Sequence, residues 1–196
     1  MPNSPWNTAR ALLFPGTRRA PSSNAPLSQE SGPAPSAAQP SQELTVYSQE
    51  PGYVVAVTGR CLIHVNQERM TSTTVSLIRR ALSDLSERYD TFGYLSVLEA
   101  TGSLTMAPDL RESVDAYVRR YSTRFTGAAI VFEAPGFQAT VVRSVVTAIN
   151  LASRASHPSK VFDDLRTGCS WLGRLTPGEP KPSRLYELAT QLRKAK

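Results

Sequence analysis

The 196-residue sequence predicts an α/β fold in which helices pack against a sheet of largely parallel strands. Two observations carry this expectation. From residue 45 onward, short β-branched runs alternate with longer segments of helical apolar periodicity, which is typical of strand–helix–strand units with right-handed crossovers. The run 127–133 is almost continuously apolar, as expected of a strand buried on both faces.

The first part of this region predicts strands joined by a tight turn. Residues 45–48 form a short strand, and a Glu-Pro-Gly turn at 50–52 follows. The β-branched run 53–58 forms a second strand that ends at Gly59. Residues 61–65 either continue that strand or form another one.

A helix follows, because apolar residues recur at spacings of three and four. Thr71 or Ser72 is placed to cap its free amides. The residues that share its apolar face are Val75, Ile78, Leu82, Leu85 and Tyr89.

Three further strand–helix units follow the same logic. Pro108 suits a first helical turn, because its missing amide would be unpaired there, and the adjacent Asp109 complements the helix dipole. The expected strands are 93–99, 127–133 and 160–162, and the expected helices start at 108, 137 and 163. Their expected inward residues are Leu110, Val114, Tyr117 or Val118, Tyr121, Val142, Val145, Val146, Ile149, Leu165, Cys169 and Leu172.

Composition divides the chain into three parts. Eight of the fifteen prolines lie in residues 1–44, and this part has too few apolar side chains to offset the entropy of ordering, so we expect a disordered arm. Trp6 and the apolar run 12–14 are either an unselected part of that arm or a short docking motif. We expect the α/β domain over 45–175 and a basic, helical tail over 176–196.

The net charge of +6 belongs mostly to that tail. Residues 181–196 carry +4, while residues 45–180 carry only +1. A nearly neutral domain disfavours nucleic acid as the main partner.

Several protein classes are disfavoured by the remaining composition. No apolar run approaches the roughly 18–20 residues of a membrane span, and the first apolar stretch stops at Pro15, too early for a signal peptide. Two cysteines build neither a disulfide scaffold nor a cysteine-rich metal site. We therefore expect a cytoplasmic protein.

No catalytic arrangement emerges from the reactive residue types. Cys61 and His64 would point to opposite faces of one strand, and Cys169 falls on an apolar helix face. Asp163 and Asp164 are placed to complement a helix dipole. The sequence predicts no enzyme activity, no metal and no cofactor.

Arginines recur along the helix that starts at 108. Acidic residues interrupt the series, so a solvated face of mixed charge is favoured over an anion or nucleic-acid site. The arginines are Arg111, Arg119, Arg120 and Arg124, and the interrupting acids are Glu112 and Asp115.

The end of the domain carries a family resemblance. Residues 159–172, S-K-V-F-D-D-L-R-T-G-C-S-W-L, resemble the close of STAS-like domains, named for sulfate transporters and anti-sigma factor antagonists, where a short "VF" strand enters an acidic helix ending in "WL". The resemblance implies a mixed, mostly parallel sheet with helices packed against it. It also implies a non-catalytic regulatory module of bacterial type that binds a partner protein.

The bacterial antagonists carry a phosphorylated serine in an Asp-Ser-Ser-Gly-type segment, which this chain lacks. Its corresponding stretch, 100–109, offers Ser103 and Thr105 as hydroxyls, but Asp109 would repel a phosphate there. By resemblance, the partner surface comprises the loop and helix start at 102–111 and the neighbouring turn at 135–137. Its expected residues are Ser103, Thr105, Asp109, Arg111 and Phe137.

Two alternatives stay open. The strand ends of an α/β sheet form crevices, so Tyr94, Met106 and Phe137 could line a site for a small molecule or lipid. The basic tail could instead touch nucleic acid or an anionic membrane.

Overall fold

The computed structural model describes residues 43–50, 52–99, 107–133, 137–153, 156–178 and 180–194. Every described residue belongs to one compact unit, Ala38–Lys196. The arm expected over 1–44 therefore lies, up to residue 42, outside the described residues.

The element order follows the alternation expected from the sequence. Along the chain the elements are β1 (Thr45–Glu50), β2 (Tyr53–Thr58), β3 (Cys61–Asn66), α1 (Ser72–Arg88), β4 (Phe92–Leu98), α2 (Pro108–Tyr121), β5 (Phe125–Phe132), α3 (Phe137–Ser153), β6 (Ser159–Phe162), α4 (Leu165–Leu175) and α5 (Pro182–Lys194).

The six strands form one sheet in sequence order, from β1 to β6. The pairs β1–β2 and β2–β3 are antiparallel, and the pairs β3–β4, β4–β5 and β5–β6 are parallel. The predicted mixed, mostly parallel sheet is confirmed. Residues 61–65 belong to a separate strand, because a tight turn containing Gly59 at φ 49° reverses the chain after β2.

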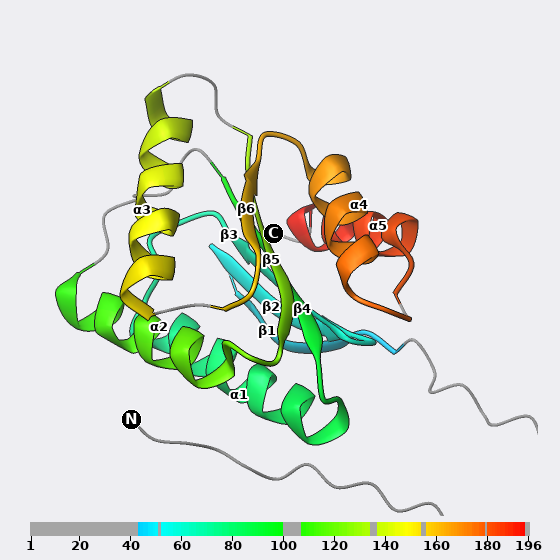
Figure 1. Cartoon of the computed structure of the whole chain (residues 1–196). Coiled ribbons are helices and arrows are strands. Elements are labelled where there is room, and N and C mark those ends of the chain that lie inside the picture. Colours follow the sequence, from blue (N-terminus) through cyan, green and yellow to red (C-terminus); the bar gives the residue numbers. More distant parts are fainter. Residues whose placement is uncertain are drawn as a thin grey trace, which may run out of the picture. The chain divides into compact units, whose positions relative to one another are not determined.

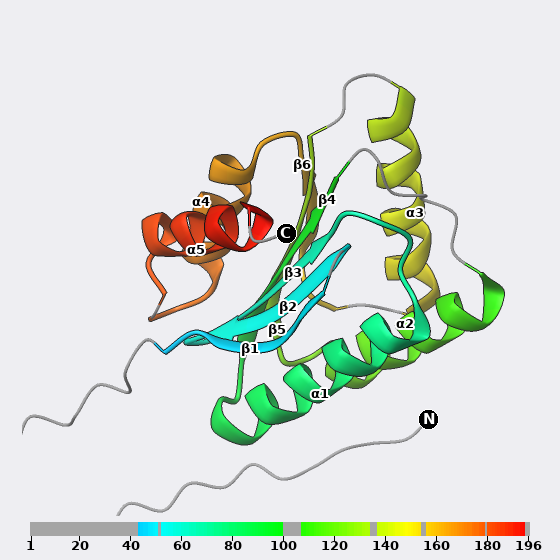
Figure 2. The same ribbon diagram turned by 180° about the vertical axis from the view of Figure 1, so that it is seen from behind.

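Helices cover both faces of the sheet. Figures 1 and 2 show α4 and α5 on one face, and α1, α2 and α3 on the other. A core cluster beneath α4 and α5 includes Ile63, Leu95 and Val131, while Leu62 belongs to the cluster beneath α1 and α2. A smaller cluster beneath α3 includes Phe132. Alternate residues of each central strand thus serve different cores, which explains why these strands are apolar throughout.

The ends of the helices follow the expected capping chemistry. Thr71 caps α1, and its hydroxyl and that of Thr74 each accept a hydrogen bond from the other residue's backbone amide. The Asp164 carboxylate accepts a hydrogen bond of 2.7 Å from the Thr167 amide, and hydrogen bonds from the Thr167 hydroxyl and amide lower the pKa of Asp164. In α2, Tyr117 and Val118 are both buried, so the inward stripe is wider than expected.

Close approach of α4 to the sheet depends on a glycine. A Cβ atom at Gly168 would lie 2.8 Å from Val131 Cγ2, which is closer than such atoms pack. Cys169, on the same helix, is fully buried, as its place on the apolar stripe predicts.

The predicted helix in the tail is confirmed as α5, but this helix does not behave as an appendage. Its apolar residues Leu185, Leu188 and Leu192 are buried in the same core as those of α4. The packed structure therefore continues to residue 194, beyond the boundary at 175 expected from the sequence. The prolines between α4 and α5 resemble a linker in composition, but here they form a tight connection between adjacent helices.

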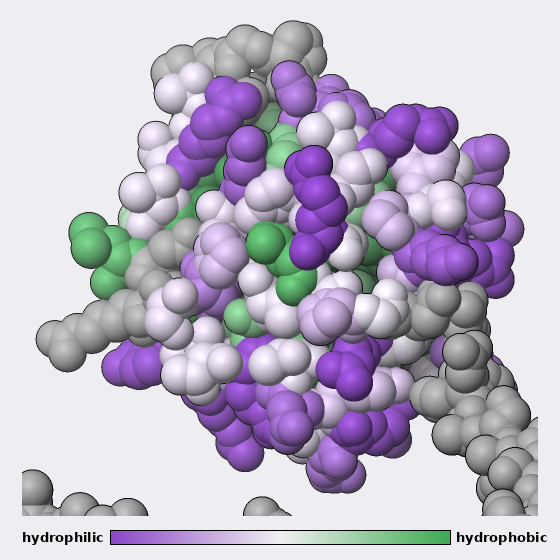
Figure 3. Space-filling model, turned by 45° about the vertical axis from the view of Figure 1, so that its right-hand side comes forward, coloured by the Kyte–Doolittle hydropathy of each residue, from purple (hydrophilic) through white to green (hydrophobic). Residues whose placement is uncertain are grey.

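The described helices include none that is both long and apolar enough to span a membrane. In Figure 3, apolar residues occur as isolated spots among hydrophilic ones on the face shown. The large apolar side chains with high exposure among the described residues are Val46 and Leu151, which lie on separate elements.

Replacing Leu185 with alanine tests whether α5 belongs to the folded unit. We expect Leu185→Ala to lower the free energy of unfolding by about 2–5 kcal/mol, because the side chain is fully buried. The matched control is Gln191→Ala, on the exposed face of α5, with an expected change below about 0.5 kcal/mol. Urea denaturation measures both, and an unchanged stability for Leu185→Ala would show that α5 packs only loosely.

Candidate functional site

The segments that carry the expected partner surface follow β4 and β5, which end at one edge of the sheet. These strands are parallel neighbours with Leu98 paired to Phe132, so the segments that follow them start at the same edge. The segment after β4 leads to α2, and the segment after β5 leads to α3.

The structure places the expected residues of that surface unequally. Asp109 and Arg111 lie exposed on the first turn of α2. Phe137 is the first residue of α3, but its side chain lies outside the described residues, as do Ser103 and Thr105. Asp109 and Arg111 are thus the expected surface residues whose accessibility the structure establishes.

An ion-pair network stands at the same edge, centred on the guanidinium of Arg193 in the last turn of α5. Its Nε lies 3.3 Å from Glu99 Oε1, and its Nη2 lies 2.9 Å from Glu133 Oε2. Glu99 directly follows β4 and Glu133 directly follows β5. One side chain therefore joins the ends of two parallel strands to α5, the last described helix.

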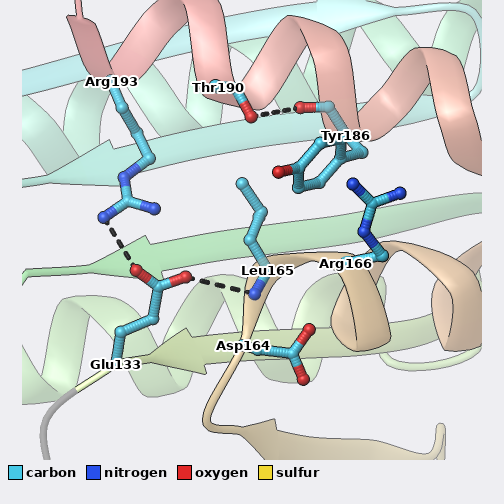
Figure 4. Close-up of a pocket in the computed structure, with 7 residues that line it drawn as sticks. All are labelled: Glu133, Asp164, Leu165, Arg166, Tyr186, Thr190 and Arg193. Atoms are coloured by element: carbon cyan, nitrogen blue, oxygen red, sulfur yellow. Dashed lines mark hydrogen bonds and ion pairs between the residues drawn. The ribbon is translucent and has the colours of Figure 1, made fainter.

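Further hydrogen bonds extend this network to the neighbouring elements. The second oxygen of Glu133 accepts a bond of 3.2 Å from the Leu165 amide at the start of α4. The Gln67 side-chain amide, just after β3, donates to the Arg193 carbonyl at 3.2 Å. Glu133 is thus shared between α4 and α5, as Figure 4 shows.

Partial burial sets the strength of these ion pairs. The side chains of Arg193, Glu99 and Glu133 retain 27%, 25% and 37% of their exposure, so water still screens them. Burial alone would lower the pKa of Arg193, but the hydrogen bonds and charges of Glu133 and Glu99 raise it. Arg193 therefore stays charged, and the network positions α5 over the strand ends more than it stabilises the fold.

A shallow pocket of about 290 Å³ adjoins the network. In Figure 4 its side chains come from the end of β5, the start of α4 and one face of α5. The Arg166 guanidinium lies 4.4 Å from the centre of the Tyr186 ring, which positions both groups at the pocket. The lining residues are Glu133, Asp164, Leu165, Arg166, Tyr186, Thr190 and Arg193.

The pocket offers charged donors and acceptors together with one aromatic face. Arg166 can donate to a carboxylate or another anion, while Tyr186 offers a surface for packing. Such a combination suits recognition of polar side chains at a protein surface.

On the other face of the sheet, His64 is fully buried. Its Nδ1 lies 3.3 Å from the Tyr94 hydroxyl and 3.5 Å from the Ser96 hydroxyl, while its Nε2 has no partner among the described residues. Burial lowers the pKa of His64 to about 4, so the imidazole is neutral near pH 7.

The two thiols lie apart from this histidine. Cys61 packs in the core beneath α4 and α5, so the expected orientation of Cys61 and His64 to opposite faces is confirmed. Burial raises the pKa of Cys61 and of Cys169 to about 12. Both thiols therefore stay protonated and unreactive near neutral pH.

The described residues contain no group of three or more His, Cys, Asp or Glu side chains that could hold a metal ion.

Arg124, which the sequence places near Arg120, donates instead to the carbonyl oxygens of Tyr89 and Asp90, where it fixes the connection after α1.

Sequence reasoning assigned Arg193 to a free basic tail and did not find its partners. A signal was present, since Glu99 and Glu133 occupy equivalent positions directly after two apolar strands. Nothing in the sequence pattern, however, specifies which distant cation approaches two such carboxylates.

Comparisons with known proteins add a likeness of architecture. No protein-family model matches the sequence, and no curated protein matches it either. The structure is similar to a crystal structure from Shewanella loihica PV-4, described as an uncharacterized protein from the DUF3478 family with a SpoIIAA-like fold. The sequence identity is 13% and the TM-score is 0.45, over 68% of this chain and 98% of the other.

Replacing Arg193 with methionine, which keeps an apolar stem, tests the network. We expect Arg193→Met to lower the free energy of unfolding by about 1–2 kcal/mol, because Glu99 and Glu133 lose a shared partner. Arg184→Met is the control, since its pair with Glu187 is exposed, and we expect a change below about 0.5 kcal/mol. If urea denaturation showed the same loss of stability for both substitutions, Arg193 would contribute no more than an exposed ion pair, and the network account would be wrong.

The buried His64 predicts a loss of stability in mild acid. Its pKa rises from about 4 in the folded protein to about 6.5 on unfolding, so the unfolded chain binds the extra proton. The contribution of the neutral His64 to the free energy of unfolding is fully present above about pH 6.5. About 3 kcal/mol of that free energy is lost as the pH falls to about 4.

Urea denaturation between pH 7 and pH 4.5 measures this loss, and we expect His64→Gln to show a much smaller one. His157→Gln is the control, because partial burial lowers the pKa of that histidine as well. If His64→Gln kept the full pH dependence, or if an NMR titration of the wild type showed His64 charged at pH 5.5, the account of His64 would be wrong.

Proposed function

We propose that this protein is a non-catalytic regulatory module that binds a partner protein at the edge where β4 and β5 end. The observation that carries the proposal is the Arg193 network. It holds Glu99 and Glu133, the first residues of the two segments that follow those strands. Binding residues commonly lie on segments that a rigid scaffold positions in this way.

Exposed residues on the helix that follows β4, and others beside Glu133, support recognition of a polar protein surface. Asp109 and Arg111 present opposite charges on the first turn of α2, and the pocket beside Glu133 adds Arg166 and Tyr186. Arginine and tyrosine are enriched in the energetically important parts of protein interfaces. The buried, protonated thiols and the neutral, buried His64 give little support to covalent or acid–base catalysis.

The two alternative functions receive less support from the described residues. Tyr94, expected to line a small-molecule or lipid crevice, instead packs against Phe125 and hydrogen-bonds to His64 within the core. A tail that reaches nucleic acid or a membrane would need α5 to be available. Its apolar face is buried, and Arg193 is already paired with two carboxylates.

Exchanging the charges at the start of α2 tests the proposed surface without altering net charge. The full chain carrying Asp109→Arg/Arg111→Asp is compared with the wild type as bait for proteins in an extract of the native cell. We expect at least one protein that the wild type recovers to be depleted about tenfold or more with this variant, because each new charge faces a like charge on the partner.

The matched control, Arg184→Glu/Glu187→Arg, exchanges an exposed pair on α5 and should recover the same protein undiminished. A Ser103→Ala/Thr105→Ala variant asks whether either hydroxyl is required. If no recovered protein discriminated the α2 exchange from the control, the proposed edge would be wrong.

A further inference from the structure

We propose that the groove between α1 and α2 binds a short acidic segment of a partner protein. This groove has a volume of about 660 Å³ and lies on the outward side of the two helices, which run side by side in Figures 1 and 2. It is distinct from the edge described above. Its lining residues are Ser76, Arg79, Arg80, Ser83, Asp84, Ser113, Ala116, Tyr117, Arg120 and Tyr121.

Three arginines from two helices converge on this groove. Arg79 and Arg80 come from α1 and Arg120 comes from α2, and all three are exposed. None of them forms a salt bridge with a carboxylate among the described residues. Their donors are therefore available to a ligand, and the planar guanidinium group matches a carboxylate in a two-pronged arrangement.

The acid within the groove is already engaged by a residue of the sheet. The Tyr47 hydroxyl, from β1, donates a hydrogen bond of 2.6 Å to Asp84 Oδ2. Burial and this hydrogen bond raise the pKa of Tyr47 to about 12, so the hydroxyl keeps its proton. Three arginines against the single carboxylate of Asp84 leave the groove with a net positive charge.

Small and hydroxyl-bearing residues form part of the lining of the groove. Ser76, Ser83, Ser113 and Ala116 leave room for a peptide to lie close to both helices. Tyr117 is 5% exposed, and its hydroxyl is hydrogen-bonded to Tyr94 beneath it, so the inner wall is fixed. The lining spans Ser76 to Asp84 on α1, about 12 Å of helix, which suits a few residues of peptide.

Charges around the groove favour a short acidic segment over a nucleic acid. Glu87 on α1, with Asp109 and Glu112 on α2, are exposed acids outside the lining. A long polyanion would extend from the three arginines onto these carboxylates and be repelled. A segment with two or three carboxylates matches the positive charge without reaching the surrounding acids.

Fluorescence anisotropy with labelled probes tests the proposal on the full chain at low salt. The probes are hexaglutamate, hexaglutamine and an oligothymidylate with six phosphates. We expect hexaglutamate to bind and hexaglutamine not to bind. Arg79→Gln/Arg120→Gln should weaken hexaglutamate binding about tenfold or more, because two of the three donors are removed.

The control variant, Arg119→Gln/Arg174→Gln, removes the same charge outside the groove and should change the affinity less than about twofold. All four positions are exposed, so thermal unfolding should be unchanged in both variants. The proposal would be overturned by absent hexaglutamate binding, by equal weakening in both variants, or by tighter groove-dependent binding of the oligothymidylate.

Discussion

The guanidinium of Arg193 joins α5 to the ends of two central strands of the sheet. It contacts Glu99 and Glu133 at the ends of two parallel strands, while its backbone carbonyl accepts a bond from Gln67 after a third. Beneath it, Leu185 and Leu188 place the same helix in the core that α4 shares with the sheet. Burial supplies most of the stability of α5, and the charges fix its position over the strand ends.

The position of α5 changes the meaning of the chain's basic character. A cluster of cations near the end of a nearly neutral domain predicts an accessory segment that contacts anions. Arg193 instead compensates two carboxylates of the domain itself, and Arg184 pairs with Glu187 within α5. Among the described residues, a group of arginines without a salt bridge lies at Arg79, Arg80 and Arg120, where two helices from separate parts of the sequence converge.

Local signals predicted the architecture because the elements are encoded locally. The spacing of Val75, Ile78, Leu82 and Leu85, and the continuous apolar strand β5, gave the right element types and the right buried faces. The site was less accessible to sequence reasoning, because it depends on contacts between residues far apart in the chain. The pair formed by Arg193 and Glu99 spans 94 positions, and no periodicity connects them.

Native-state hydrogen exchange of the wild-type protein tests the central claim that α5 is part of the folded unit. The amides of Leu188, Ala189 and Leu192 can be compared with those of the buried α4 residues Cys169 and Leu172. If α5 and its Arg193 contacts belong to the domain, both helices should exchange with similar opening free energies, close to that of global unfolding. Exchange in α5 through local opening, several kcal/mol below that of α4, would contradict the account.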